Sequence, residues 1–391
     1  MKKLALLFLT ILSSLSLNTL ANNVTSNQVI VVDAGSSGTR LHLFQKNDNG
    51  TMTELTSKVK VTPGLSSFID DTQADKNGVD TTGIQNSMSE LVKQLNNPSM
   101  IAPGTPMYVD ATAGLRLVRK DAANMALQTA ALALQKDLHL TLTPNYSIIS
   151  GAQEAFYDWV GLNLTQNNTT DSESGVLDLG GASAEIAFDA PSAKASQSTF
   201  DLKVFTPLYQ GKRYHIVAQS LLGEGEDAAM ASIDGTTPNA RAACFLQGTW
   251  GAEATGTDSA VHYDFTACKN DTIQFFTANQ LTHKLQLLHQ LLSDNPQSNW
   301  QAISGFAYTA GFFNASSVSA LEANASQFQD TTWAQALKQY GAPQYLQKYF
   351  FAAAYSDALL QLCLNTAQPE VQFSKGVDWT NGVAFDHFFA S

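Results

Sequence analysis

The 391-residue chain has only three cysteines, and no CxxC pair or histidine cluster accompanies them. The spacing typical of structural zinc sites is therefore missing. Cys244 and Cys268 flank a polar segment and can close a loop as a disulfide in an oxidising compartment. Cys363 lies in an apolar stretch with helical spacing, which predicts a buried thiol.

Basic residues are also scarce. The chain has 22 Lys and Arg against 34 Asp and Glu, a formal net charge of −12. This balance argues against a nucleic-acid partner, because such proteins need a basic stripe to neutralise phosphates. An acidic protein can still bind a small anionic ligand if backbone N–H groups and a cation neutralise the ligand's charge locally. The 44% hydrophobic and 14% charged content is that of a globular protein long enough for two domains.

Long hydrophobic runs are absent except at the start of the chain. Met1-Lys2-Lys3 precedes an apolar run over residues 4–12, and Thr19-Leu20-Ala21 supplies small residues for cleavage. This pattern predicts a signal peptide over residues 1–21 and a secreted or periplasmic protein without a stable membrane anchor. An uncleaved anchor is the alternative, although the apolar core is short for a bilayer span.

Two strand–turn–strand patterns stand out in what is present. Residues 33–40 (DAGSSGTR) follow an apolar run at residues 29–32, and residues 178–185 (DLGGASAE) follow Val176-Leu177. In both places an aspartate ends a strand and a turn of small residues leads into a second apolar run. The two copies lie a domain's length apart, which predicts two related domains.

Turns without bulky side chains let backbone N–H groups approach a phosphate chain. The first turn offers such groups at Gly35, Ser36, Ser37 and Gly38, and the second at Gly180, Gly181, Ala182 and Ser183. Asp33 and Asp178, on opposite sides of a cleft, suit a hydrated Mg²⁺ or Ca²⁺ whose other ligands are phosphate oxygens. Either turn taken alone is more typical of an Asx turn or an ordinary hairpin. The duplication favours the phosphate-binding interpretation.

The remaining pattern alternates strands with helices and predicts an α/β protein with mixed sheets. We expect a strand at residues 107–111 running into a turn with Thr112 and Arg116, and a short strand near residues 147–149. Residues 166–174 and 232–275 are predicted to be loop-rich. Helices are predicted over residues 121–138, 152–163, 281–292 and 345–364.

Taken in order, residues 33–40, 111–116, 151–163 and 178–186 resemble the apyrase-conserved regions of the nucleoside triphosphate diphosphohydrolase (ecto-apyrase) family, with a weaker fifth match at residues 378–382. The few cysteines fit a bacterial exported member. The resemblance implies two actin-like (RNase H-like) domains with mixed sheets flanked by helices and an active-site cleft between them. Domain I would span residues 28–145, with residues 366–391 returning to it, and domain II residues 146–365.

The resemblance also implies roles for individual residues. Glu154 would be the general base, Ser183 would position the attacking water, and Thr112 would support the water or the metal shell. Asp33 and Asp178 would hold a divalent cation, Mg²⁺ or Ca²⁺, with Trp379 near that ion through water. Both small-residue turns would hold phosphates, and Tyr308 and Tyr355 are candidates for stacking on the nucleobase.

The chain departs from the family pattern at several positions. Glu185 stands where the family usually has Gln, so a second acid beside the base can shift the pH optimum or compete for the metal. Gln153, Asp158 and Asn381 also differ from the usual residues.

These implications predict metal-dependent hydrolysis of the terminal phosphate of nucleoside tri- or diphosphates by direct attack of water. An exopolyphosphatase, another phosphotransferase of the same fold and a non-catalytic nucleotide-binding protein remain as alternatives.

Overall fold

The structure is a computed structural model that describes residues 26–56, 58–72, 78–165, 173–199, 201–209, 211–234, 243–248, 263–278, 280–341, 345–367 and 370–390. The expected signal peptide (residues 1–21) and residues 166–172 of the expected polar loop lie outside these residues.

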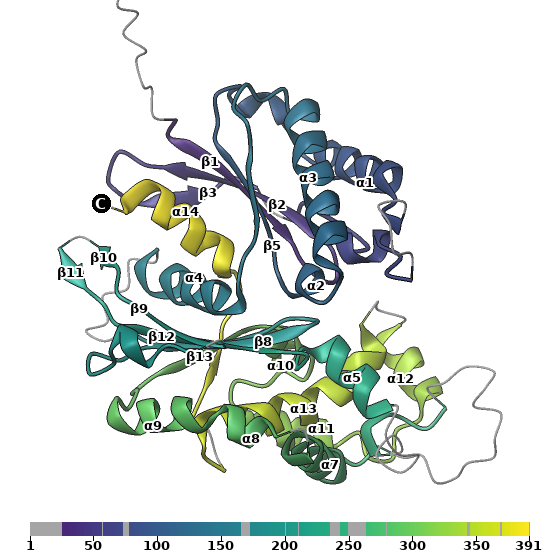
Figure 1. Ribbon diagram of the computed structural model, residues 1–391. Helices are drawn as coiled ribbons and strands as arrows, with labels where there is room; N and C mark the ends of the chain where they lie inside the picture. Colours follow the sequence, from purple (N-terminus) through teal and green to yellow (C-terminus); the bar gives the residue numbers. More distant parts are fainter. Residues whose placement is uncertain are drawn as a thin grey trace, which may run out of the picture.

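A first mixed sheet is built from the N-terminal part of the chain (Figure 1). β1 (Gln28–Ala34) lies between its antiparallel partner β2 (Thr39–Lys46) and its parallel partner β5 (Met107–Ala111). β3 (Met52–Glu54) and β4 (Lys60–Val61) pair with β2, and β6 (Asn145–Ile148) pairs with β5. The expected hairpin over residues 28–44 and the strand at 107–111 are confirmed.

Both faces of this sheet are covered, which explains the continuous apolar run in β1. Ile30 and Val32 pack in a core with α1 (Thr81–Lys93) and α3 (Lys120–Asp137), whereas Val29 and Val31 point to the opposite face. There they meet α14 (Trp379–Phe389), the last helix of the chain.

The second mixed sheet repeats this plan. β7 (Gly175–Leu179) lies between its antiparallel partner β8 (Ser183–Asp189) and its parallel partner β13 (Trp300–Ser304). The order β14-β13-β7-β8-β12-β9 is completed by β9 (Leu202–Phe205), β12 (Ile216–Leu222) and β14 (Gln372–Phe373). The duplicated sequence pattern therefore corresponds to a duplicated strand arrangement.

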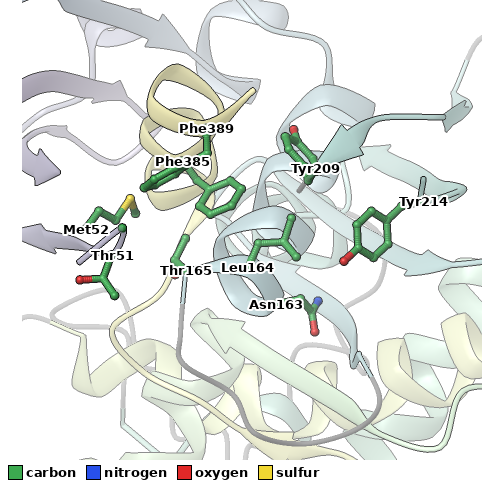
Figure 2. A pocket seen from close by; sticks show the side chains of 10 residues that line it. Thr51, Met52, Asn163, Leu164, Thr165, Tyr209, Tyr214, Phe385 and Phe389 are labelled. Atoms are coloured by element: carbon green, nitrogen blue, oxygen red, sulfur yellow. The ribbon is translucent and has the colours of Figure 1, made fainter. Parts of the chain in front are cut away.

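Helices α4 (Gly151–Leu164) and α14 lie side by side between the two sheets (Figure 1). Glycines allow this close approach, because a Cβ on Gly382 would lie 2.0 Å from the Tyr157 carbonyl oxygen. A pocket of about 240 Å³ opens beside the C-terminal ends of both helices, and Figure 2 shows Leu164, Phe385 and Phe389 around it. Since β6 belongs to the first sheet and β14 to the second, the chain passes from the first sheet to the second after Ile148. After Phe373 it continues into α14, which contacts β1 of the first sheet.

The opposite face of the second sheet is covered by α7 (Phe265–Ala278), α8 (Leu281–Lys284), α9 (Gln286–Asp294), α10 (Gly305–Phe312), α11 (Val318–Ser326) and α13 (Leu346–Leu364). α5 (Glu226–Asp234) and α12 (Trp333–Tyr340) lie beside the end of this sheet (Figure 1). The loop prediction for residues 232–275 is wrong over α7, whose buried Phe265, Cys268, Thr272 and Phe276 have helical spacing. The expected single helix over 281–292 is two helices with a turn at Leu285. None of the helices in the described part of the chain combines the length and apolar character needed to cross a membrane.

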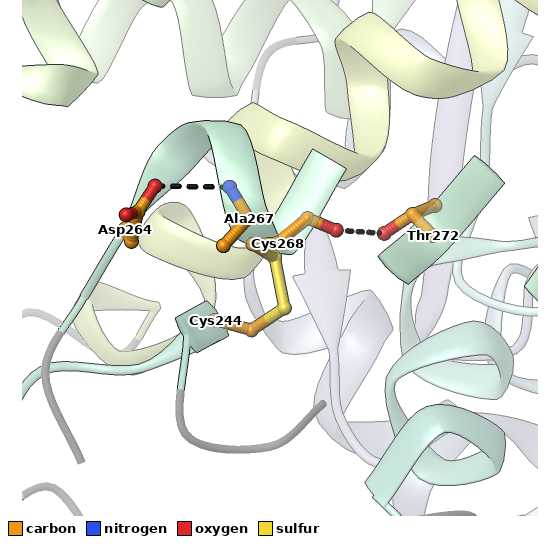
Figure 3. The surroundings of a disulfide bond; sticks show 5 residues. All are labelled: Cys244, Asp264, Ala267, Cys268 and Thr272. Atoms are coloured by element: carbon orange, nitrogen blue, oxygen red, sulfur yellow. Dashed lines mark hydrogen bonds between the residues drawn. A yellow bond between two sulfur atoms is a disulfide. The ribbon is translucent and has the colours of Figure 1, made fainter. Parts of the chain in front are cut away.

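The disulfide between Cys244 and Cys268 is confirmed (Figure 3). It ties the segment after α5 to the first turn of α7, where Asp264 accepts a hydrogen bond from the Ala267 N–H at 2.9 Å. Cys363 is a buried free thiol in α13, also as predicted.

Candidate active site

A cleft of about 740 Å³ lies between the two sheets and is lined by both small-residue turns. The turns approach each other directly, because a Cβ added to Gly181 of the second turn would lie 2.7 Å from the Ser36 hydroxyl of the first. A side chain at position 181 would force the Ser36 and Asp227 side chains to move. Backbone groups from both halves of the chain therefore line the same cleft.

The first turn carries an aspartate that is already paired. Asp33 is buried at the end of β1, and its Oδ2 accepts a hydrogen bond from Arg40 Nη1 at 2.7 Å. Burial raises the pKa of the Asp33 carboxyl, and the Arg40 charge opposes that shift. The other oxygen, Oδ1, has no hydrogen-bond partner among the described residues.

The second turn places Asp178 in a more acidic setting. Burial and the nearby Glu185 carboxylate raise the pKa of Asp178 to about 7, against a hydrogen bond from Ser304 that favours the ionised form. One oxygen of this carboxylate is also buried without a hydrogen-bond partner in the described part of the chain. Asp178 therefore needs a cation or a proton in its vicinity.

These two carboxylates fit the expected divalent cation. No cluster of three or more His, Cys, Asp or Glu suited to a metal occurs among the described residues. A hydrated Mg²⁺ needs only one or two carboxylates when phosphate oxygens complete its shell. Asp33 and Asp178 both line the cleft, and each keeps one buried oxygen unpartnered.

Arg116 joins the acids of the cleft floor. It lies at the end of the short helix α2 (Ala113–Arg116), and its Nη1 donates to Glu154 Oε2 at 2.9 Å. Its Nη2 donates to the Ser183 hydroxyl at 3.1 Å and lies 3.4 Å from Glu185 Oε1. Ser183 and Ser220 in turn donate to the same Glu185 oxygen at 2.6 and 2.7 Å. One guanidinium thus fixes two buried carboxylates.

Glu154 lies in the first turn of α4, which begins with a capping box between Ser150 and Gln153. The position is favourable for an acid, since the helix N-terminus carries partial positive charge. Burial and the Glu185 carboxylate nevertheless raise the pKa of Glu154 well above its ordinary value, and Arg116 only partly opposes them. A carboxyl with a raised pKa that lines the cleft is suited to proton transfer.

Aromatic residues line another part of the cleft. Tyr308 of α10 is 58% exposed, and Tyr345 and Tyr349 at the start of α13 line the same space. Tyr355 is fully buried in the core, and its hydroxyl donates to the Glu224 carbonyl at 2.7 Å. The prediction that Tyr355 contacts a nucleobase is therefore wrong, and Tyr349, six residues earlier, lines the cleft instead.

The structure separates the predicted site residues into two groups. Those that line the cleft are Asp33, Gly35, Ser36, Ser37, Thr112, Glu154, Asp178, Gly180, Gly181, Tyr308 and Trp379. Those outside its lining are Gly38, Ala182, Ser183, Glu185 and Tyr355. Ser183 and Glu185 lie behind Glu154, where they contact Arg116.

Arg116 and Asp378 have contacts in the cleft region that the sequence did not predict. Asp378 lines the cleft and caps α14 by accepting a hydrogen bond from the Thr380 N–H at 2.9 Å. Its negative charge is among the causes that raise the pKa of both Asp33 and Asp178. Both residues lie inside the recognised motifs, but the acids that they influence come from other motifs.

Known proteins resemble this chain in sequence and in fold. The family described as GDA1/CD39 (nucleoside phosphatase) matches residues 19–345. A nucleoside-triphosphatase of Pisum sativum is 32% identical over 270 residues, covering 63% of this chain and 56% of the pea protein. An ectonucleoside triphosphate diphosphohydrolase 1 of Bos taurus is 26% identical over 409 residues, covering 90% of this chain and 77% of the bovine protein.

The fold also resembles that of solved structures with low sequence identity to this chain. The crystal structure of an exopolyphosphatase from Cytophaga hutchinsonii matches with a TM-score of 0.56 at 12% identity, covering 92% of this chain and 97% of that one. At this identity the likeness shows the fold alone, and it confirms the predicted actin-like α/β class with two mixed sheets. The family match extends over most of the chain and agrees with the ordered motifs. The chain therefore belongs to the GDA1/CD39 (nucleoside phosphatase) family.

Proposed function

We propose that the protein hydrolyses the terminal phosphate of nucleoside tri- and diphosphates by direct attack of water. The observation that carries the proposal is the meeting of the two small-residue turns beside Glu154 in one cleft. Phosphoryl transfer depends mainly on positioning and charge stabilisation, and these turns supply backbone donors on two sides of a phosphate chain.

Glu154 acts as the general base in this proposal. It accepts a proton from water while the water oxygen forms a bond to the terminal phosphorus and the bond from phosphorus to the leaving oxygen breaks. Arg116 holds one Glu154 oxygen by its 2.9 Å hydrogen bond and so orients the carboxylate. Inorganic phosphate and the shortened nucleotide leave, and no residue becomes phosphorylated.

Ser183 and Glu185 are positioning residues, because they contact Arg116 and do not line the cleft. Thr112, which lines the cleft at the start of α2, supports the attacking water. Asp33 and Asp178 would hold a hydrated Mg²⁺ or Ca²⁺, with Trp379 beside it through water. The ion would neutralise charge on the transferring phosphate.

The proposal extends to the nucleobase site, the two domains and the location of the protein. Tyr308 would contact the nucleobase, together with Tyr349 in place of the buried Tyr355. The two halves would act as domains, but their boundaries lie after Ile148 and after Phe373 and not at the predicted 145/146 and 365/366, because β6 pairs with β5 and β14 pairs with β13. Export to the periplasm or the exterior is supported by the sequence of residues 1–21 and by the disulfide. Nucleotides, and no nucleic acid or membrane, are the proposed partners.

The test is release of inorganic phosphate from ATP, ADP, GTP, GDP and polyphosphate, with Mg²⁺, Ca²⁺ or a chelator, for the wild type and Glu154→Gln. We expect metal-dependent nucleotide hydrolysis that collapses in the variant. Activity on polyphosphate alone would identify an exopolyphosphatase and overturn the proposal. Tight ATP binding without release would identify a non-catalytic nucleotide-binding protein.

A further inference from the structure

We propose that Glu226 reads the edge of the nucleobase and makes guanine nucleotides the preferred substrates. This inference rests on the proposed function and names the substrate class of the same cleft. Glu226 contributes to no motif recognised in the sequence.

Glu226 is attached to the second phosphate turn through its backbone. It opens α5, and its N–H donates to the Gly180 carbonyl at 2.9 Å, while the Asp227 N–H donates to the Gly181 carbonyl at 2.9 Å. The helix start is therefore fixed relative to the turn that would hold the phosphates. Glu226 itself lines the cleft.

The two neighbouring acids differ in their contacts. The Asp227 carboxylate is paired with Lys348 of α13. The Glu226 carboxylate is partly buried and makes no hydrogen bond or ion pair with any residue in the described part of the chain, although the Lys348 charge opposes the effect of burial on its pKa. It is thus available to a ligand, whereas the Asp227 carboxylate is engaged.

Aromatic side chains of α10 and from the start of α13, namely Tyr308, Tyr345 and Tyr349, line the same cleft as Glu226. Burial raises the pKa of the Tyr349 hydroxyl, and the negative charge of Glu226 adds to this shift. Rings can stack on the face of any base, but only a polar group at the edge distinguishes one base from another.

A carboxylate at that edge selects for guanine. Guanine presents two adjacent N–H donors, at N1 and at the 2-amino group, which match the two oxygens of one carboxylate. Adenine presents an unprotonated N1 there, which repels a carboxylate oxygen, and uracil offers one N–H between two carbonyls. Burial raises the pKa of Glu226 to about 7, so the carboxylate is ionised above neutral pH.

The test compares kcat/KM for GDP, IDP and ADP in the wild type, Glu226→Gln and Asp227→Asn. We expect the wild type to prefer GDP over ADP by about 10- to 100-fold, the range for a two-bond contact to a base edge. IDP, which lacks the 2-amino group, should lie between them. Glu226→Gln should bring the three values to within a few-fold of one another, mainly by raising KM for GDP.

Asp227→Asn is the matched control, because it removes the same charge from the adjacent position. Its GDP-to-ADP ratio should stay close to that of the wild type even if its overall rate changes. Equal wild-type rates on GDP and ADP would overturn the inference while leaving nucleotide hydrolysis intact. A ratio that changes equally in both variants would also overturn it, because cleft charge alone would then set the preference. Absence of hydrolysis of every nucleotide would instead overturn the proposed function.

Discussion

The two phosphate turns share one strand arrangement but carry opposite charges at one equivalent position of the second strand. In the first half, Asp33 of β1 is the register partner of Arg40 on β2. In the second half, Asp178 of β7 is the register partner of Glu185 on β8. The equivalent position therefore carries a cation in one copy and an anion in the other.

This difference suggests that the two halves have different tasks, charge neutralisation in the first half and proton transfer in the second. Arg40 compensates Asp33 directly, so the first turn keeps its own charge balance. In the second half Glu154 and Glu185 both contact Arg116, and Asp178 lies near Glu185. Burial raises the pKa values of all three acids, and the Glu185 charge adds to the shifts of Glu154 and Asp178. We infer that the first half mainly binds and the second half carries the acid–base chemistry.

The largest expected effect comes from removing the base. Glu154→Gln keeps the shape and the Arg116 contact but cannot accept a proton. We expect kcat for phosphate release to fall by about 10²- to 10⁴-fold, the usual range for a general base, while nucleotide binding measured by calorimetry persists.

Asp110→Asn is the control in the first half. Asp110 is a buried acid whose burial raises its pKa to about 6, and its Oδ1 accepts a hydrogen bond from Ser147 at 2.7 Å outside the cleft. Its activity should stay within about twofold of the wild type, since it contacts no reacting group. A comparable loss in both variants would contradict the division between the halves.

The two arginines should differ in their effect on stability. Arg116→Met leaves two buried carboxylates without their cationic partner, and breaking such a network costs about 3–5 kcal/mol of unfolding free energy. Arg40, whose side chain is 34% exposed, supports one carboxylate, so Arg40→Met should cost only about 1 kcal/mol. Denaturant unfolding measures both values at pH 8, and similar losses would show that Arg116 is not the centre of the acid network.

Local features of the site were predictable because short segments encode them. The turns at Gly35 and Gly180 and the Ser150 cap before Glu154 depend on residues within a few positions of one another. The Arg116 network was not predictable, since its side-chain partners Glu154, Ser183 and Glu185 come from α4 and β8, far along the chain.

The aromatic assignment failed for a different reason. Helix α13 is apolar around most of its circumference, so its sequence does not show which tyrosine faces a cleft. Tyr355 and Tyr349 were indistinguishable by pattern, and only the packing of α13 against α7 and α10 decides between them. In α7, by contrast, the helical spacing of Phe265, Cys268 and Phe276 was present in a segment that its polar neighbours made look like a loop.

The smallest effect is expected from removing the charge of Glu185, the anion that distinguishes the second turn from the first. Glu185→Gln retains acceptors for Ser183, Ser220 and Arg116 but removes the charge that raises the pKa values of Asp178 and Glu154. Both pKa values should therefore fall, so that the ionised forms persist at lower pH. We expect the acidic limb of the kcat/KM profile to move down by about one pH unit.

Ser220→Ala separates this charge effect from a loss of hydrogen bonding. The variant removes one donor to Glu185 and leaves the charge in place, so Glu185 keeps its contacts with Ser183 and Arg116. Losing a donor disfavours the ionised Glu185, which predicts a small shift of the limb in the direction of Glu185→Gln and well below it in size. If Glu185→Gln leaves the limb unmoved, the Glu185 charge does not control the acids of the cleft, and the two turns differ in sequence without differing in chemistry.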